Sequence, residues 1–367
     1  MTETSPFLPW LDAIQPYVPG KPPKDILGQI PFDSLANLAS NENALGPSHR
    51  VLEALGDAAA TLHRYPDDRA QTLKGVVAAR LDLDPSQIAV GNGSNDLIDL
   101  LVRITSAPGT EVVMSEHSFP TCRIAALGSG AKLTLVPQKN DTHDLVAMAA
   151  AVGPDTRLVY VCNPNNPTGT MNTEAEVDRF LRSLPDHVLP VFDEAYFEYA
   201  ESAEFPDLVP RVRRGERLCV LRTFSKIFAI PALRIGYGLC PSDVTSRIEK
   251  IRLPFNVNGV AQQAAIVSLS DAAQIPRARA FNVAGKGYLR RELDRLGVSY
   301  TNSQTNFLMI SVPEPKELSI ELLKRGVVIR PLVSFGLTPD RYRVTVGTPH
   351  ENERFVHAME DILRGTR

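Results

Sequence analysis

The chain has 367 residues, of which 43% are hydrophobic and 22% are charged. This length and this apolar fraction favour a globular protein with a large core and more than one domain. The formal net charge of -3 excludes a strongly basic protein of the kind that binds nucleic acid.

No apolar run is long enough to span a membrane, and residues 1–10 lack the basic start and apolar stretch of a signal peptide. Four cysteines lie far apart and form no Cys-x-x-Cys pair: Cys122, Cys162, Cys219 and Cys240. We therefore expect neither a disulfide framework nor a metal site. A reducing compartment, the cytoplasm, fits this cysteine usage.

The first part of the chain predicts an N-terminal arm followed by a strand-and-helix domain. Residues 1–35 are rich in proline, and a short helix is expected near residues 9–14. Short apolar runs then predict seven strands, at residues 88–90, 111–114, 132–136, 158–162, 188–192, 218–221 and 234–239. Helical patterns separate several of them, for example at residues 96–104. This alternation is typical of a mostly parallel sheet covered by helices on both faces, an α/β fold.

The last part of the chain predicts a smaller α+β domain. Residues 258–296 have a helical pattern with an interruption near Pro276. Strands are expected at residues 307–311, 327–330 and 342–346, with a helix at residues 317–325. We predict an arm over residues 1–35, a large domain over residues 36–260 and a small domain over residues 261–367.

Lys226 follows an apolar strand, and two hydroxyl side chains precede it closely, at Thr223 and Ser225. An isolated lysine at a strand end is usually a surface residue. Here Arg234 comes eight residues later, and hydroxyls together with an arginine are the groups that bind a phosphate. An amine beside a phosphate site is what a cofactor bound as a Schiff base requires.

Asp193 stands at the end of the strongly apolar run before Glu194, Ala195 and Tyr196. A carboxylate in this place can simply cap the next helix. It can also lie opposite a pyridine nitrogen, where it keeps that nitrogen protonated and makes the ring an electron sink. Tyr196 is then close enough along the chain to hydrogen-bond a ring hydroxyl.

Two turns complete the set of candidate residues. The run Asn-Pro-Asn-Asn-Pro-Thr-Gly at residues 163–169 follows a predicted strand, and it places Asn166 for a contact with a cofactor oxygen. The run Gly-Asn-Gly-Ser-Asn at residues 91–95 opens a predicted helix, where backbone N–H groups converge on an anion. Neither run is a nucleotide-binding motif of the GxGxxG or Walker type.

The order and spacing of these motifs resemble those of fold-type I pyridoxal-phosphate (PLP) aminotransferases. More narrowly, the chain is similar to histidinol-phosphate aminotransferases. The stretches that carry this narrower resemblance are Tyr-Val-Pro-Gly-Lys at 17–21, Leu-Ala-Ser-Asn-Glu-Asn at 38–43, Arg-Tyr-Pro-Asp at 64–67, residues 91–96, and Tyr-Arg-Val-Thr-Val-Gly at 342–347. The resemblance thus covers nearly the whole chain and implies the fold-type I architecture, with a seven-stranded sheet in the large domain.

The resemblance implies a role for each candidate residue. Lys226 is the Schiff-base lysine and proton carrier, Asp193 holds the pyridine nitrogen, and Tyr196 holds the ring oxygen with Asn166. The phosphate is bound by Gly93, Ser94, Asn95, Thr223, Ser225 and Arg234, and Phe119 stacks on the ring. The substrate is bound by Asn41, Arg330 and Arg343. Tyr17 and Tyr65 reach the active site of the other subunit of a homodimer, Tyr17 towards the substrate and Tyr65 towards the PLP phosphate.

Three positions depart from the family pattern. Ala44 stands where proline is usual, His117 stands where many relatives have tyrosine, and Ile230-Pro231-Ala232 replaces a small, glycine-containing run. His117 in such a place is more often a packing residue than an acid or base.

The resemblance implies transfer of an amino group between glutamate and imidazole-acetol phosphate, giving 2-oxoglutarate and histidinol phosphate. An amino donor and a 2-oxo acid are thus the expected small-molecule partners. Three alternatives stay open at this point: an aromatic amino-acid aminotransferase, a PLP-dependent decarboxylase or oxidase, and a catalytically silent PLP-binding protein. The last would lack Lys226 or Asp193, and both are present.

Overall fold

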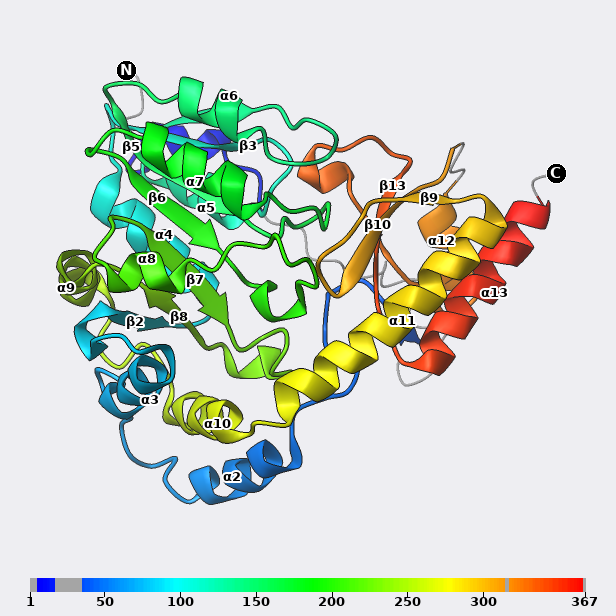
Figure 1. Cartoon of the computed structure of the whole chain (residues 1–367), viewed down its shortest axis with the longest axis horizontal. Helices are drawn as coiled ribbons and strands as arrows, with labels where there is room; N and C mark the ends of the chain where they lie inside the picture. Colours follow the sequence, from blue (N-terminus) through cyan, green and yellow to red (C-terminus); the bar gives the residue numbers. More distant parts are fainter. Residues whose placement is uncertain (1–4, 17–34, 314–316, 366–367) are drawn as a thin grey trace.

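A computed structural model describes residues 5–16, 35–313 and 317–365. Its central feature is a seven-stranded sheet in the order β2-β8-β7-β6-β5-β3-β4 (Figure 1). The strands are β2 (Ile88–Gly91), β3 (Glu111–Ser115), β4 (Lys132–Val136), β5 (Thr156–Cys162), β6 (Leu189–Asp193), β7 (Cys219–Thr223) and β8 (Gly236–Leu239). Strand β8 runs antiparallel to β2 and β7, and the other strand pairs of this sheet are parallel. The predicted α/β fold class with a mostly parallel seven-stranded sheet is confirmed.

Helices cover both faces of this sheet, and side chains alternate between two cores along each strand. On β5, Val159 and Val161 belong to one core, while Leu158 and Tyr160 belong to the other. Burial on both faces explains why the strands are continuous apolar runs. The helices of this part are α2 (His49–Ala59), α3 (Gln71–Leu81), α4 (Ser94–Thr105), α5 (Thr121–Gly128), α6 (Leu145–Ala150), α7 (Glu174–Ser183), α8 (Val209–Arg213), α9 (Ser242–Ile251) and α10 (Gly259–Ser270). Short 3-10 turns are η1 (Pro9–Ala13), η3 (Pro85–Gln87), η4 (Phe197–Tyr199) and η5 (Pro231–Leu233).

A second sheet, in the order β12-β13-β10-β9, lies on the other side of the molecule (Figure 1). Its strands are β9 (Ser299–Tyr300), β10 (Phe307–Ser311), β12 (Arg330–Pro331) and β13 (Arg341–Thr345), and η6 (Val333–Phe335) follows β12. A separate pair joins β1 (Ala36–Asn37) to β11 (Val327–Val328) in parallel. Helices α11 (Gln274–Leu296) and α13 (Pro349–Gly365) pack with α12 (Leu318–Lys324) around a third core. The division of the chain at residues 35 and 260 stays a prediction.

The helical stretch predicted at residues 258–296 is two helices. The break lies at residues 271–273, and Pro276 falls in the first turn of α11 instead of at the break. Proline fits there because the first N–H groups of a helix have no partner within the helix. Helix α11 then runs from the first sheet to the second (Figure 1).

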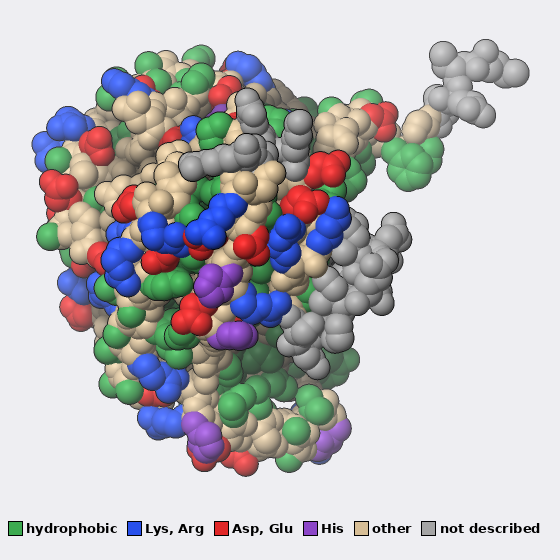
Figure 2. All heavy atoms as spheres, turned by 90° about the vertical axis from the view of Figure 1, so that its right-hand side faces the viewer, with side chains coloured by type: hydrophobic (Ala, Val, Ile, Leu, Met, Phe, Trp, Pro, Cys, Tyr) green, Lys and Arg blue, Asp and Glu red, His purple; other side chains and the backbone are tan. Residues whose placement is uncertain are grey.

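The surface at the end of the molecule that carries α11 and α13 mixes charges of both signs (Figure 2). Arg295 there pairs with Glu292 and Glu360, and Arg364 also pairs with Glu360. Within the described ranges, no helix combines the length and the apolar character needed to cross a bilayer.

Gly236, the first residue of β8, brings that strand against the turn that opens α4. A Cβ atom at Gly236 would lie 2.5 Å from the Ser94 nitrogen and 2.8 Å from the Gly93 carbonyl carbon. Both are backbone atoms, which cannot move aside as a side chain can. Glycine at this position therefore fixes where α4 begins relative to the sheet.

We predict that Gly236→Ala lowers the free energy of unfolding by about 3 kcal/mol, because two backbone segments must separate. Gly238→Ala is the matched control on the same strand. Its nearest neighbour would be the Leu221 Cδ2 methyl at 3.1 Å, which belongs to a side chain. Urea denaturation of both variants measures the difference. Equal losses in the two variants would contradict the role given to Gly236.

Candidate active site

A cavity of about 240 Å³ opens at the carboxyl ends of β5, β6 and β7. Ligands of α/β sheets bind at this edge, where the loops after parallel strands meet. Its walls contain most of the predicted site residues: Asn41, Ser94, Asn95, Phe119, Asn166, Asp193, Tyr196, Thr223, Ser225, Lys226, Arg234, Arg330 and Arg343. Segments that are far apart in the sequence therefore form one chamber between the two sheets.

One end of the cavity is built to bind an anion. Helix α4 begins at Ser94, after Gly93 with a positive φ of 82°, and the backbone N–H groups of its first turn have no partner within the helix. Arg234 Nη1 lies 3.4 Å from Ser225 Oγ, and the Thr223 hydroxyl accepts a hydrogen bond from the Ser225 N–H at 3.1 Å. A Cβ atom at Gly93 would lie 2.6 Å from Arg234 Nη2, so a larger residue in this turn would displace the guanidinium from its place.

Asp193 ends β6 and is only 2% exposed. Its Oδ1 accepts a hydrogen bond from the Ala195 N–H at 3.1 Å, and its Oδ2 accepts one from the Tyr160 hydroxyl at 2.7 Å. Burial raises the pKa of this carboxyl to about 6, while the bond from Tyr160 opposes that rise. A buried carboxylate that borders a cavity is a candidate partner for a cationic group of a ligand.

Lys226 lies in the same cavity, where its Nζ donates to the Ser40 and Asn41 carbonyl oxygens, both at 3.3 Å. Removal from water, followed by the positive charge of Arg343, lowers the pKa of the Lys226 amine to about 8. The amine is thus much easier to deprotonate than an ordinary lysine, which suits a nucleophile and a base.

Tyr196 and Asn166 are both held by neighbours at the cavity wall. The Tyr196 hydroxyl accepts a hydrogen bond from Asn41 Nδ2 at 2.8 Å, and burial raises its pKa. Asn166 Oδ1 accepts a hydrogen bond from Arg343 Nη1 at 2.5 Å. The two side chains are therefore fixed before any ligand binds.

Arg330 and Arg343 come from neighbouring strands of the second sheet and are paired in register. Each is 5% exposed, and both line the cavity. Arg343 Nη2 donates to the Ala39 carbonyl oxygen at 2.7 Å, and Arg330 Nη2 donates to Ser334 Oγ at 3.2 Å. Two guanidinium groups at one wall form a second candidate anion site. This site comes from the second sheet, whereas the α4 site belongs to the first.

Among the described residues, two predicted site residues, Tyr65 and Gly93, do not line this cavity. Tyr65 is 82% exposed and stacks on Phe255 with ring centroids 4.7 Å apart. Tyr17 lies outside the described residues. Gly93 does not itself line the cavity, although it caps the helix that does.

Sequence reasoning missed Tyr160, the residue that hydrogen-bonds Asp193. Tyr160 occupies an apolar strand, where tyrosine usually packs in a core. Its position follows from strand register: Cys162 pairs with Asp193, so Tyr160 lies two residues back on the same face. Residues 39 and 40 and Pro231 also line the cavity without having been predicted.

The Asp193 carboxyl predicts a pH dependence of stability in the protein free of bound cofactor. Its pKa is raised from 3.8 to about 6 on folding, so the folded protein binds this proton more tightly. That contribution is complete below about pH 4 and is lost as the pH rises through about 6. Wild type should therefore lose stability relative to Asp193→Asn between pH 4 and pH 7.

Urea denaturation of both proteins at intervals of one pH unit measures this difference. Tyr160→Phe removes the bond that favours the carboxylate, so the loss should begin at the same pH and extend to higher pH in that variant. A stability difference between wild type and Asp193→Asn that is constant over this range would refute the assignment.

Comparisons with known proteins agree with this geometry. Residues 33–359 match the family described as aminotransferase class I and II. The chain is 41% identical over 358 residues to histidinol-phosphate aminotransferase 2 of Pseudomonas fluorescens, with 97% of this chain and 96% of that protein covered. It shares the fold of histidinol-phosphate aminotransferase from Sinorhizobium meliloti in complex with pyridoxal-5'-phosphate, with a TM-score of 0.87, 27% identity and all of both chains covered.

The same fold also occurs in a decarboxylase. The L-threonine-O-3-phosphate decarboxylase from Porphyromonas gingivalis matches 89% of this chain and 99% of its own, with a TM-score of 0.79 and 24% identity. The fold by itself therefore does not fix the reaction. The family match and the relative with 41% identity do fix the family, and they confirm the predicted resemblance to fold-type I PLP aminotransferases. This chain belongs to the aminotransferase class I and II family.

Proposed function

We propose that the chain is a PLP-dependent histidinol-phosphate aminotransferase that uses glutamate and 2-oxoglutarate as its second substrate pair. One observation carries the proposal: an amine, a buried carboxylate and two separate anion sites line a single cavity. The name of the Pseudomonas relative, which covers nearly the whole chain, supports the choice of substrate.

The donor set fits PLP. The α4 turn with Thr223, Ser225 and Arg234 would hold the phosphate, and the Asp193 carboxylate lies in the same chamber to hold the pyridine nitrogen. Asn166 and Tyr196 would hold the ring oxygen, and Phe119 would cover the ring. Gly93 supports this fit, because any larger residue would displace the Arg234 guanidinium. When bound, PLP supplies an aldehyde for the substrate amine and a ring that accepts the electron pair released at the substrate carbon.

The residues of the chain then perform three tasks. Lys226, whose pKa is lowered to about 8, gives up its proton readily and moves a proton to and from the reacting carbon. Asp193 keeps a positive charge on the ring nitrogen, which matters most when electrons are drawn into the ring. Arg330 and Arg343 bind the anionic end of the substrate, and a planar guanidinium suits either a phosphate or a carboxylate. The same pair can therefore serve histidinol phosphate in one half-reaction and 2-oxoglutarate in the other.

The test is a half-reaction that is monitored through the visible absorption spectrum of the cofactor. Histidinol phosphate added to the PLP-loaded protein should bleach the visible absorbance, and 2-oxoglutarate should restore it. The kcat/KM for histidinol phosphate should exceed that for phenylalanine by at least about tenfold, since phenylalanine lacks the phosphate that Arg330 and Arg343 would bind. Lys226→Ala should lose turnover by several orders of magnitude while remaining folded.

Other outcomes would identify another activity. Preference for phenylalanine or tyrosine would make the chain an aromatic amino-acid aminotransferase. Release of carbon dioxide, or uptake of oxygen without recovery by 2-oxoglutarate, would indicate a decarboxylase or an oxidase. If no amine changed the spectrum, the chain would be a PLP-binding protein without catalytic activity.

We also propose that the working unit is a homodimer in the cytoplasm. Tyr65, Phe255, Leu253 and Leu62 are large apolar side chains with 42% to 82% of their surface exposed, on or near the two loops that carry Tyr65 and Phe255. An exposed apolar cluster of this kind is typical of a surface that binds another protein subunit. The fact that all four cysteines are free and buried supports a reducing compartment.

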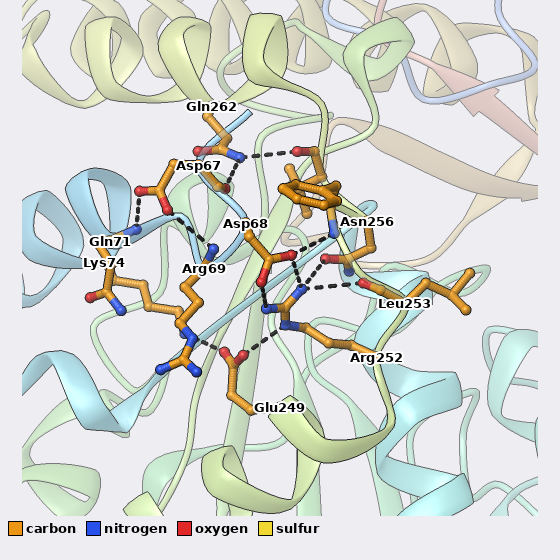
Figure 3. A network of polar contacts seen from close by, with 12 residues as sticks. Asp67, Asp68, Arg69, Gln71, Lys74, Glu249, Arg252, Leu253, Asn256 and Gln262 are labelled. Carbon is orange, nitrogen blue, oxygen red and sulfur yellow. Dashed lines mark hydrogen bonds and ion pairs between the residues drawn. The ribbon is translucent and has the colours of Figure 1, made fainter. Parts of the chain in front are cut away.

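A polar network fixes the two loops that carry this cluster (Figure 3). Arg252 binds both oxygens of Asp68, at 3.0 Å and 2.8 Å, and also binds Glu249 at 2.7 Å. The Asn256 side chain donates to Asp96, and the backbone carbonyl oxygen of Asn256 accepts from the side chain of Asn92 in the turn that opens α4. Tyr65 is thus presented outward by a rigid loop that is tied to the phosphate end of the site.

Shared sites predict complementation between two chains that are each clearly impaired alone. One chain carries Tyr65→Phe, and the other carries Lys226→Ala. A mixed dimer has one site that combines an intact Lys226 with an intact Tyr65, so activity should rise above both parents after subunit exchange.

In the matched control, the Lys226→Ala chain is replaced by a chain that carries both Lys226→Ala and Tyr65→Phe. Mixing this chain with the Tyr65→Phe chain gives no complete site. Activity that stays at the level of the parents in the first mixture would contradict shared sites. Full activity of a monomer in sedimentation at assay concentration would contradict the dimer.

A further inference from the structure

His117, which departs from the family pattern, lies in the loop after β3, next to the cavity. Its carbonyl oxygen accepts hydrogen bonds from Gln138 Nε2 and from Asn165 Nδ2, both at 2.9 Å. The next residue, Ser118, donates to Asn165 Oδ1 at 3.1 Å. The loop is therefore anchored by the segment that also carries Asn166, and its backbone has little freedom to move.

The imidazole of His117 contacts the turn that follows β12 of the second sheet. Its Nδ1 lies 3.0 Å from the Phe335 carbonyl oxygen. A carbonyl can only accept, so Nδ1 carries the hydrogen and donates it. Gly336 has a positive φ of 82°, and a Cβ atom there would lie 3.3 Å from His117 Nδ1. Glycine lets the turn after η6 come close enough for this bond.

The turn that His117 binds also contacts both substrate arginines. The Phe335 ring centroid lies 5.8 Å from Arg330 Cζ and 5.9 Å from Arg343 Cζ. Ser334, in the same turn, accepts the hydrogen bond from Arg330. Aromatic rings attract guanidinium groups at these distances. A shift of the turn would therefore change the position of both cations at the cavity wall.

We propose that His117 is a positioning residue, whose hydrogen bond to Phe335 holds the turn at residues 333–336 and thereby places Arg330 and Arg343 for the substrate anion. The inference rests on the proposed function only in assigning the anion to these arginines. His117 itself touches neither cofactor nor reacting atoms in this arrangement. Its effect is expected on substrate binding more than on the chemical step.

Two variants separate the hydrogen bond from simple packing. His117→Asn keeps a nitrogen donor at the δ position, where the imidazole has Nδ1. His117→Leu keeps a branch of similar shape at that position and has no donor. The side chain of His117 is 24% exposed, so neither change buries a polar group or opens a deep cavity. His187→Leu, at an exposed histidine in the loop before β6, is the control for loss of a histidine.

The first measurement is amide hydrogen exchange of the PLP-loaded enzyme in the segment of residues 332–337. His117→Leu should speed exchange there about fivefold, the effect expected for one hydrogen bond, while His117→Asn and His187→Leu stay near wild type. This measurement needs no substrate, so it tests the contact even if the proposed substrate is wrong.

The second measurement is steady-state kinetics with the amino donor that proves active. For His117→Leu, KM should rise about fivefold with kcat within about twofold of wild type, and His117→Asn should restore KM. Unchanged exchange in His117→Leu, an equal fall in kcat and kcat/KM, or a His117→Asn variant that behaves like His117→Leu would each overturn the proposal. Faster exchange with an unchanged KM would overturn the link to the arginines.

Discussion

The carboxylate of Asp193 is buried at the end of a central strand, and most of the site is arranged around it. Burial favours its neutral form, yet its proposed role requires the ionised form. Tyr160 and the Ala195 N–H oppose the effect of burial by donating hydrogen bonds to it. The Ala195 N–H reaches the carboxylate from two residues further along the same segment. The register of β6 against β5 brings the Tyr160 hydroxyl to it, because Asp193 pairs with Cys162. A cationic ring nitrogen would supply the remaining compensation.

The second sheet contributes two arginines to the wall of the cavity. The first sheet offers the carboxyl ends of its strands, the α4 turn and Lys226, all suited to a cofactor. Arg330 and Arg343 come from paired positions of β12 and β13, so a single strand pairing delivers two cations to one wall. The bond from His117 to Phe335 then connects the two halves beside the cavity. In the proposed function, cofactor binding and substrate binding therefore depend on different sheets.

The sequence predicts much of this arrangement, for physical reasons that differ by element. Strands buried on both faces are continuous apolar runs, and their positions were predicted within a few residues. The strand expected at residues 234–239 begins at Gly236 instead, because Arg234 has a left-handed backbone with a φ of 56°. Contacts that depend on register, such as the bond from Tyr160 to Asp193, leave no local pattern. The proposed role of Tyr65 also leaves no local pattern, because it concerns the active site of a partner subunit.

The central claim is that Lys226 carries the cofactor opposite Asp193. The most direct measurement is borohydride reduction of the PLP-loaded protein, followed by peptide mapping by mass spectrometry. The account predicts one modified lysine, Lys226, with the same label at lower occupancy in an Asp193→Asn protein. A label on any other lysine, or an unlabelled Lys226 in a protein that retains bound PLP, would contradict it.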